Sequence, residues 1–399
     1  MTETAKKSLF YDFLARYGGT DFDSYMAASV QDEDYLNWNG HTLPYVFEDA
    51  EKEYRAVREG CALFDATPAN KYRITGTDAG PLLDYMTTRS MSQLAPMRAT
   101  YGLWCNADGM VNDDSMLFKL ADDDFLLMAA EVDHLDYISD LATRFVDAVV
   151  VDESELWAGL AVQGAKSCAV LNDFGFTGVE LLRPYDIAYF DLMGERVIVA
   201  RVGFTGDLGY EIWFARSLAP AIEAAFLAAE GSLGLQISGY GLTTIQLCRM
   251  ESGMIVPGWD TAQTFEDPEF ERSPLELGLA WNLDLEREED FVGKEALIKE
   301  RAEGSRFVMK GFEVDAQCDL LDGSELFATI DGADVQVGTL PSVSWSHDAV
   351  RWIGLSSLQT QHAAVAEGFV VIDDERIVCS IVDLPFVNIA RRRQTPAPL

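Results

Sequence analysis

The sequence predicts an α+β fold in which two related α+β units precede a C-terminal β-barrel or sandwich. Through most of the chain, segments with apolar residues at helical spacing alternate with short strand-like runs, and this texture occurs twice. After about residue 304 the pattern changes to short apolar strands at hairpin spacing. We therefore expect an N-terminal extension over 1–42, α+β units over about 43–155 and 156–303, and a β-barrel over 304–399.

The elements of the extension and of the first unit follow in order. Residues 10–18 carry apolar side chains at helical spacing and end in a Gly-Gly stop, which predicts a short helix. Residues 48–65 predict a helix followed by a strand. Alternating apolar residues predict strands over 71–76, 115–120 and 124–130. Amphipathic spacing predicts helices over 79–87 and 134–145.

The second unit and the barrel are predicted from the same patterns. Residues 157–164 open the second unit, with helices over 165–175 and 218–229 and a strand over 195–204 between them. The barrel strands are expected over 307–314, 325–330, 335–345, 369–372 and 377–386.

Composition narrows the classes of protein. The 399 residues are 48% hydrophobic, but no stretch approaches 18 apolar residues and the N-terminus lacks the apolar core of a secretory signal, so we expect a cytoplasmic globular protein. Sixty-six acidic residues against thirty basic ones give a net charge of −36, which argues against nucleic-acid and membrane partners. The acid is spread along the chain, which predicts an acidic surface and leaves a saline cytoplasm as one explanation. Six widely spaced cysteines predict reduced thiols in the core.

Familiar catalytic signatures are absent from the sequence. It has no phosphate-binding loop, dinucleotide fingerprint, nucleophile elbow or zinc-protease motif. None of the four histidines, His41, His134, His347 and His362, stands near another candidate ligand in the sequence, so no metal site is predicted. Carboxylates must then carry the proton chemistry.

The first motif that offers such carboxylates runs from Tyr101 to Asp114. It reads as a strand, a glycine turn at Gly109 and a second strand that begins with Asp113 and Asp114. Alternation places these two side chains on opposite faces, so that one can face a cleft while the other is solvated or caps a turn. A solvated turn rich in Asn and Asp is the alternative interpretation.

The second motif, VGFTGDLGYEI, begins at Val202. Its three glycines would let the backbone approach a flat ligand, Phe204 is available to stack, and Glu211 begins a strand. A carboxylate can accept two parallel hydrogen bonds from an aminopyrimidine edge, which pterins present. The alternative is a glycine-rich hairpin with a surface glutamate. In a third segment, LCRMESGM, Arg249 either pairs with a buried carboxylate or meets an anionic ligand.

At these segments the chain resembles the aminomethyltransferase superfamily, which includes the glycine-cleavage T-protein and dimethylsulfoniopropionate demethylase. The resemblance is collinear from about residue 43 to 386 and runs through FEDAEKEYRAVREGCALFD, YGLWCNADGMVNDD, LAVQGAKSCAVL, GFTGDLGYEIWF and LCRMESGM. It implies a ring of three domains around a tetrahydrofolate site, with folate bound by residues 43–303 and the β-barrel after them.

The resemblance also implies roles for individual residues. Asp113 matches the catalytic aspartate, although a one-residue gap would give that place to Asn112. Glu211 matches the pterin-binding glutamate, and Phe204 falls where the motif has tyrosine. Gln163 matches a glutamine of the family, and Arg391 falls near a basic residue that meets the folate tail. Arg249, from the third segment, is a further candidate for binding the cofactor.

Departures from the T-protein pattern shape the functional hypothesis. Ile245 replaces an arginine, and FDATPAN replaces FDVSHM. We therefore expect a tetrahydrofolate-dependent methyltransferase or demethylase that moves a methyl group from a small S-, N- or O-methyl substrate to N5 of tetrahydrofolate, acting as a monomer or homodimer. The alternatives are an aminomethyltransferase of the glycine cleavage system, with a lipoyl carrier protein as partner, and a non-catalytic folate-binding protein.

Overall fold

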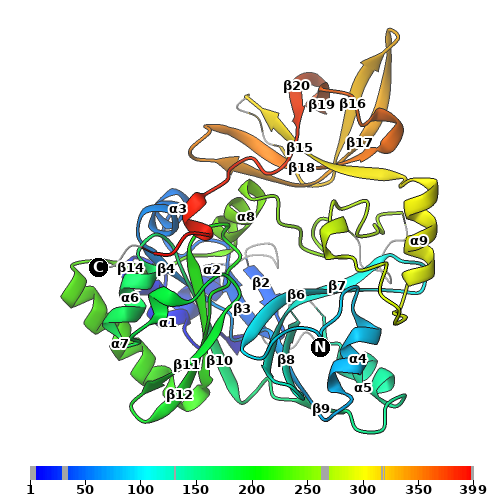
Figure 1. The fold of residues 1–399 in the computed structure, drawn as a ribbon. Helices are drawn as coiled ribbons and strands as arrows, with labels where there is room; N and C mark the ends of the chain where they lie inside the picture. The colour runs from blue at the N-terminus through cyan, green and yellow to red at the C-terminus, as the bar shows by residue number, and fades with distance from the viewer. Residues whose placement is uncertain are drawn as a thin grey trace.

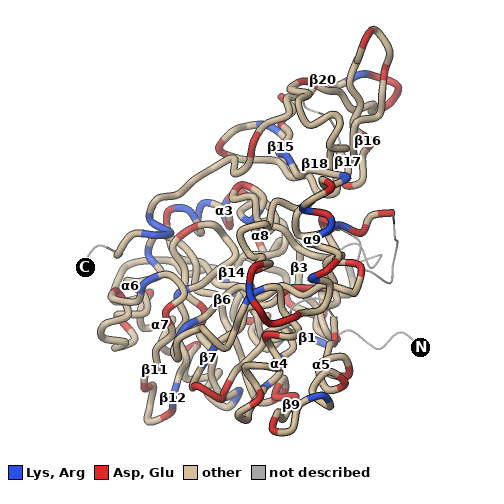
Figure 2. The backbone as a smooth tube through the Cα atoms, turned by 45° about the vertical axis from the view of Figure 1, so that its right-hand side comes forward, with Lys and Arg blue, Asp and Glu red and all other residues tan. Residues whose placement is uncertain are grey.

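The computed structural model describes residues 6–28, 35–129, 132–261, 269–315, 318 and 320–396. Two sheets lie beside each other, and a closed barrel stands at one end of the pair (Figure 1). The predicted α+β class and the C-terminal barrel are confirmed. Acidic residues occur along both sheets and along the barrel (Figure 2).

The first sheet has six strands in the order β11-β12-β13-β10-β4-β14. Its strands are β4 (Cys61–Asp65), β10 (Trp157–Gln163), β11 (Ile187–Leu192), β12 (Glu195–Ala200), β13 (Gly209–Ala215) and β14 (Ile237–Gly239). The accompanying helices are α3 (Ala50–Glu59), α6 (Ser167–Asp173), η3 (Val179–Leu181), η4 (Arg216–Leu218) and α7 (Ala219–Leu233). Alternate residues of β10 and β13 pack with α6 and α7 into a core that holds Val162, Ile212 and Phe226.

The second sheet has five strands in the order β6-β7-β8-β5-β9. It consists of β5 (Asn70–Thr75), β6 (Arg98–Cys105), β7 (Val111–Ala121), β8 (Asp124–Ala129) and β9 (Val149–Asp152), with α4 (Ala79–Met86) and α5 (Leu135–Ala142) packed on it. The sheets do not divide at residue 155, because β4 pairs antiparallel with β10 and parallel with β14. Such pairing between distant segments leaves no mark in the local pattern.

The N-terminal segment is part of the six-stranded half. It forms β1 (Lys6–Lys7), α1 (Tyr11–Leu14), η1 (Ala15–Tyr17), α2 (Phe22–Ala28), β2 (Tyr35–Trp38) and β3 (His41–Pro44). Phe10 and Leu14 are buried in the core of that half, and the backbone N–H of Phe10 donates to Asp65 Oδ2 at 3.0 Å. β1, β3 and β2 form a separate three-stranded sheet, so the segment predicted as an extension helps to build the core beside the first sheet and not the sheet itself.

The barrel follows a stretch that holds α8 (Leu242–Glu251), η5 (Ala280–Asn282) and α9 (Lys294–Glu303). Its strands are β15 (Phe307–Val314), β16 (Ser324–Ile330), β17 (Ala333–Ser346), β18 (Arg351–Gln359), β19 (Glu367–Ile372) and β20 (Glu375–Val382), with η6 (Thr360–His362) after β18. The predictions omit β18, whose six central residues are all buried and therefore show no alternation. After β20 the chain returns to the sheets and ends with η7 (Ala390–Arg392).

All six cysteines are free thiols, as predicted, and five of them are buried. Among the described residues, no helix has the length and apolar character needed to cross a membrane.

Candidate functional site

A cavity of about 210 Å³ lies where both sheets, β2 and α8 meet. Most of its walls are aromatic or aliphatic, and they include Leu36, Trp38, Phe64, Trp213, Tyr240 and Trp259. Its polar side chains include Asp114, Ser115, Glu211 and Arg249. A few polar groups in an apolar cavity are the usual composition of a small-molecule site.

Glu211 lines this cavity from β13, which lies between β10 and β12. Its side chain is half-buried in the wall of the cavity. Trp213 Nε1 donates to Glu211 Oε2 at 3.2 Å, and no other hydrogen bond to this carboxylate occurs within the described residues. Burial raises the pKa of Glu211 to about 7, and the Trp213 bond offsets this effect only in part. The carboxylate therefore keeps acceptor capacity for a ligand.

The two aspartates of the first motif lie on opposite sides of β7, as alternation predicts. Asp113 is fully buried, and its Oδ2 lies 2.7 Å from His134 Nε2. Asp114 lines the cavity, where Tyr101 Oη donates to its Oδ2 at 2.6 Å. Asp113 was expected at the site, whereas the structure buries Asp113 in the core and places Asp114 in the cavity lining. Asn112, the other candidate, is half-buried and outside the cavity lining.

The glycine-rich segment also differs from its predicted use. Phe204 lines the cavity as expected. A Cβ on Gly203 or on Gly209 would lie 2.1 Å from Gln163 Oε1, so these glycines make room for the Gln163 side chain. Gln163 is fully buried, donates to the Tyr210 carbonyl at 3.1 Å and accepts from the hydroxyl of Thr205 at 2.8 Å. Gln163 therefore holds the glycine-rich segment in place by hydrogen bonds and does not line the cavity.

Arg249 reaches the cavity wall with its hydrogen-bonding capacity already used. Its Nη1 and Nη2 bond to Asp260 at 2.5 and 3.0 Å. Its remaining N–H groups bond to the Met254 carbonyl at 2.9 Å, to Ser342 at 3.2 Å and to Gln246. A guanidinium has five N–H donors, so none is left for folate. Arg249 therefore pairs with a buried carboxylate, which is the first of the two roles considered for it in the sequence.

Arg391 lies outside the cavity and binds the glycine-rich loop. Its Nε and Nη2 bond to the Asp207 carboxylate, and Nη2 also donates to the Arg58 carbonyl. The backbone N–H of Val387 donates to the Glu251 carbonyl at 2.8 Å. The C-terminal segment thereby fastens the loop that carries Phe204, instead of meeting a ligand in the cavity.

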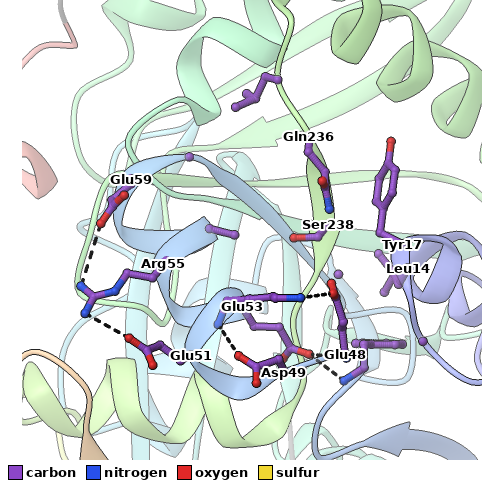
Figure 3. Close-up of a pocket in the computed structure, with 17 residues that line it drawn as sticks. Leu14, Tyr17, Glu48, Asp49, Glu51, Glu53, Arg55, Glu59, Gln236 and Ser238 are labelled. Carbon is purple, nitrogen blue, oxygen red and sulfur yellow. Dashed lines mark hydrogen bonds and ion pairs between the residues drawn. The ribbon is translucent and has the colours of Figure 1, made fainter.

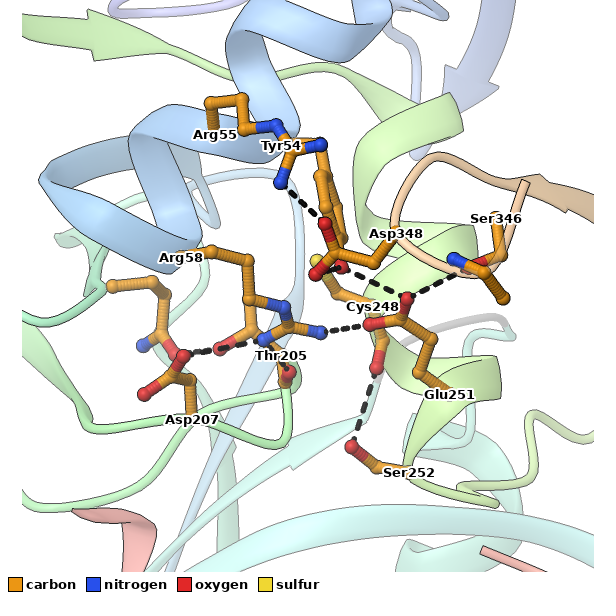
Figure 4. Close-up of polar contacts among 12 residues, drawn as sticks. Tyr54, Arg55, Arg58, Thr205, Asp207, Cys248, Glu251, Ser252, Ser346 and Asp348 are labelled. Carbon is orange, nitrogen blue, oxygen red and sulfur yellow. Dashed lines mark hydrogen bonds and ion pairs between the residues drawn. The ribbon is translucent and has the colours of Figure 1, made fainter. Parts of the chain in front are cut away.

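A buried ionic network surrounds this attachment (Figure 4). Arg58 Nη2 donates to Glu251 Oε2 at 2.6 Å, and its Nη1 donates to the Thr205 carbonyl at 2.8 Å. Tyr54 Oη lies 2.9 Å from Glu251 Oε1 and 3.0 Å from Asp348 Oδ2. The network joins α3, the glycine-rich loop, α8 and the turn between β17 and β18.

A larger concave region of about 770 Å³ lies beside α3 and β14 (Figure 3). Two of its carboxylates, those of Glu53 and Asp49, accept hydrogen bonds from the protein's own backbone. Glu53 Oε1 accepts from the backbone N–H groups of Phe47 and Glu48 at 2.7 and 3.0 Å. Asp49 caps α3 by accepting from the backbone N–H of Lys52 at 2.9 Å. We assign this groove no ligand.

The cavity suits a reduced folate. Glu211 offers a carboxylate with spare acceptor capacity among apolar walls, where two hydrogen bonds to an aminopyrimidine edge are strong. Phe204, Trp38 and Trp213 supply aromatic surface for a flat ring. Sequence reasoning missed Trp38, Trp259 and Tyr101 as site residues, because only tertiary packing brings them together. Within the described part of the chain, no cluster of His, Cys, Asp and Glu could hold a metal ion.

Two sheets around an apolar cavity that Glu211 lines, joined to a barrel, are the arrangement expected of a folate-dependent one-carbon transferase. The model of the GCVT N-terminal domain matches residues 24–287, and the chain belongs to this tetrahydrofolate-dependent family. The aminomethyltransferase of Clostridium botulinum (strain Okra / Type B1) is 32% identical over 283 residues, 70% of this chain and 74% of the relative. That of Halothermothrix orenii is 27% identical over 356 residues, 88% of this chain and 95% of the relative.

The crystal structure of glycine cleavage system aminomethyltransferase T from Bartonella henselae has a TM-score of 0.81. It covers 96% of this chain and 99% of its own at 21% identity, and it supports the fold alone. The prediction of a methyl-group demethylase was wrong, because relatives matched over most of their length are aminomethyltransferases. That prediction relied on departures at single positions such as Ile245, which by themselves do not indicate a different reaction.

Proposed function

We propose that the protein is an aminomethyltransferase that passes a one-carbon unit from an aminomethylated carrier to tetrahydrofolate. The observation that carries this proposal is that two carboxylates, Glu211 and Asp114, line one apolar cavity. Family membership supports the cofactor, and the relatives' names support the reaction.

Glu211 serves as the anchor for the aminopyrimidine edge of the pterin. Its ionised form can accept two N–H bonds at once, and the cavity walls keep competing water away. The bound folate supplies the nitrogen atoms that receive the one-carbon unit.

Asp114 is the group that handles protons and holds the cationic amine of the donor. Tyr101 Oη donates to it at 2.6 Å and fixes its orientation. Burial and the neighbouring Asp114 carboxylate raise the pKa of Tyr101 well above its usual value, so the phenol remains a donor at neutral pH. A carboxylate held in this way can receive a proton or return it to the departing amine.

The other walls suit a donor carried on an aliphatic arm. Leu36, Ile245 and Trp259 line the cavity with apolar surface. A lipoyl-type arm, whose thioether sulfur bears the aminomethyl group, gains free energy by burying its chain against such surface. We therefore take a lipoyl carrier protein as the partner.

The decisive experiment supplies aminomethylated lipoyl carrier protein and tetrahydrofolate to the purified protein. We expect methylenetetrahydrofolate, ammonia and reduced carrier in equal amounts. Folate binding, seen as a rise in melting temperature, without any product would replace this proposal with a non-catalytic folate-binding protein. Failure to bind folate would overturn the assignment of the cavity.

A further inference from the structure

β7 contains two neighbouring aspartates, Asp113 and Asp114, and only one of them lines the cavity. Asp113 and Asp114 are chemically identical, and the side chains of a strand alternate between its faces. A shift of one residue in pairing would exchange them, placing Asp113 in the cavity and Asp114 in the core. Something outside β7 must therefore select which of them serves the site.

The pairing of β7 with β6 is interrupted beside this pair. Trp104 lies opposite Asp113, whereas Cys105 lies opposite Val111, so Asn112 is the extra residue of a β-bulge. A bulge disrupts the regular ladder and changes the face to which the following residues point. Asp113 Oδ1 accepts from the backbone N–H of Asp114 at 2.8 Å and thereby helps to hold the local backbone.

On the core side, Asp113 depends on one side chain from another element. His134 Nε2 lies 2.7 Å from its Oδ2, and only 5% of His134 is exposed. His134 is itself held in place, because its backbone N–H donates to Tyr72 Oη at 3.0 Å. Its ring also meets Trp104 edge-on, with ring centroids 5.0 Å apart.

On the cavity side, the matching contact is the hydrogen bond from Tyr101 to Asp114. Each face therefore offers a side-chain partner to the aspartate that points to it. Without His134, the buried carboxylate of Asp113 would lose the side-chain partner that it has among the described residues, and burying an unpaired charge is costly. That cost would favour the shifted pairing or a distorted bulge.

We propose that His134 is a positioning residue that holds Asp113 in the core and thereby presents Asp114 to the cavity. This inference rests on the proposed role of Asp114 in catalysis. His134 itself does not line the cavity and acts through the β7 backbone.

The test compares turnover of four variants in the carrier assay. His134→Leu should lower kcat about 10- to 100-fold, with the Kd for tetrahydrofolate within about threefold of wild type, because Glu211 lies on the other sheet. His134→Gln, whose amide can still donate to Asp113, should stay within about fivefold of wild type. His362→Leu, in the barrel, is the matched control and should leave kcat unchanged.

The fourth variant, Asp113→Leu with His134→Leu, separates positioning from loss of packing. It removes the competing carboxylate, and exchanging a buried polar pair for apolar residues is often tolerated, so it remains informative if His134→Leu does not fold. We expect kcat to recover to within about fivefold of wild type. A double variant that folds but stays as slow as His134→Leu, or a His134→Leu protein with normal kcat, would overturn the inference.

Combining His134→Leu with Asp114→Asn tells this inference apart from the proposed function. If His134 acts through Asp114, the combined variant should be no slower than Asp114→Asn alone, within about twofold. Multiplying defects would refute the positioning role only. Normal kcat in Asp114→Asn would refute the proposed function and this inference together.

Discussion

Replacing Glu211 by glutamine should weaken the binding of tetrahydrofolate and remove the pH dependence of that binding. The side chain keeps its size, so the cavity is preserved. The amide offers one acceptor where the carboxylate offers two, and its NH₂ group faces a ligand donor. Losing charge-assisted bonds in an apolar site costs about 2–4 kcal/mol, a weakening of roughly 30- to 700-fold in Kd.

The pH dependence follows from the raised pKa of Glu211, which burial brings to about 7. Folate donors bind the ionised carboxylate, so binding favours ionisation and the pKa in the complex is lower than in the free protein. The affinity for tetrahydrofolate therefore reaches its full value above about pH 7. It falls as the pH falls below 7, because the Glu211 carboxyl must first lose its proton. Between pH 8 and pH 6 the wild-type Kd should rise about tenfold.

Anaerobic titration calorimetry with tetrahydrofolate at pH 6, 7 and 8 measures both effects. The Kd of Glu211→Gln should be nearly constant across this range, whereas that of wild type should not. Glu195→Gln, at the exposed start of β12, is the matched control and should behave as wild type. A wild-type Kd that is flat with pH, or a Glu211→Gln protein that binds as tightly as wild type, would refute the reasoning.

Three further predictions concern catalysis and stability. Asp114→Asn should lower single-turnover rates by about two to four orders of magnitude, whereas Asp113→Asn, which can still pair with His134, should stay within about fivefold of wild type; equal defects would contradict this assignment. Asp260→Ala leaves the Arg249 guanidinium buried without its carboxylate, so urea denaturation should show a loss of about 3–5 kcal/mol, and an unchanged midpoint would count against a structural Arg249. Molar KCl should raise the melting temperature by screening repulsion within a chain of net charge −36, and a flat or falling melting temperature would argue against it.

Several features were predictable from local sequence because local physics sets them. Helical spacing predicted α3, α4 and α7, and alternating residues predicted β5, β7 and β15. The glycine-rich motif pointed to Phe204 and Glu211, and both residues line the cavity, while their contact with folate stays a prediction.

Other features depend on partners that are distant in the sequence. Gln163 and Arg249 are polar residues in motifs that suggested ligand contacts, yet Thr205 and Asp260 use their hydrogen-bonding groups. Such saturation depends on three-dimensional neighbours, so the sequence alone could not separate a structural polar residue from a binding one.

The pair Asp113 and Asp114 shows most clearly which features the sequence sets and which the tertiary structure sets. By itself, the sequence determined that Asp113 and Asp114 lie on opposite faces, because strand geometry has a period of two. Only the tertiary structure decided that Asp114 meets the cavity. A bulge at Asn112 sets the local pairing, and His134, 21 residues after Asp113, supplies the partner that the buried carboxylate requires.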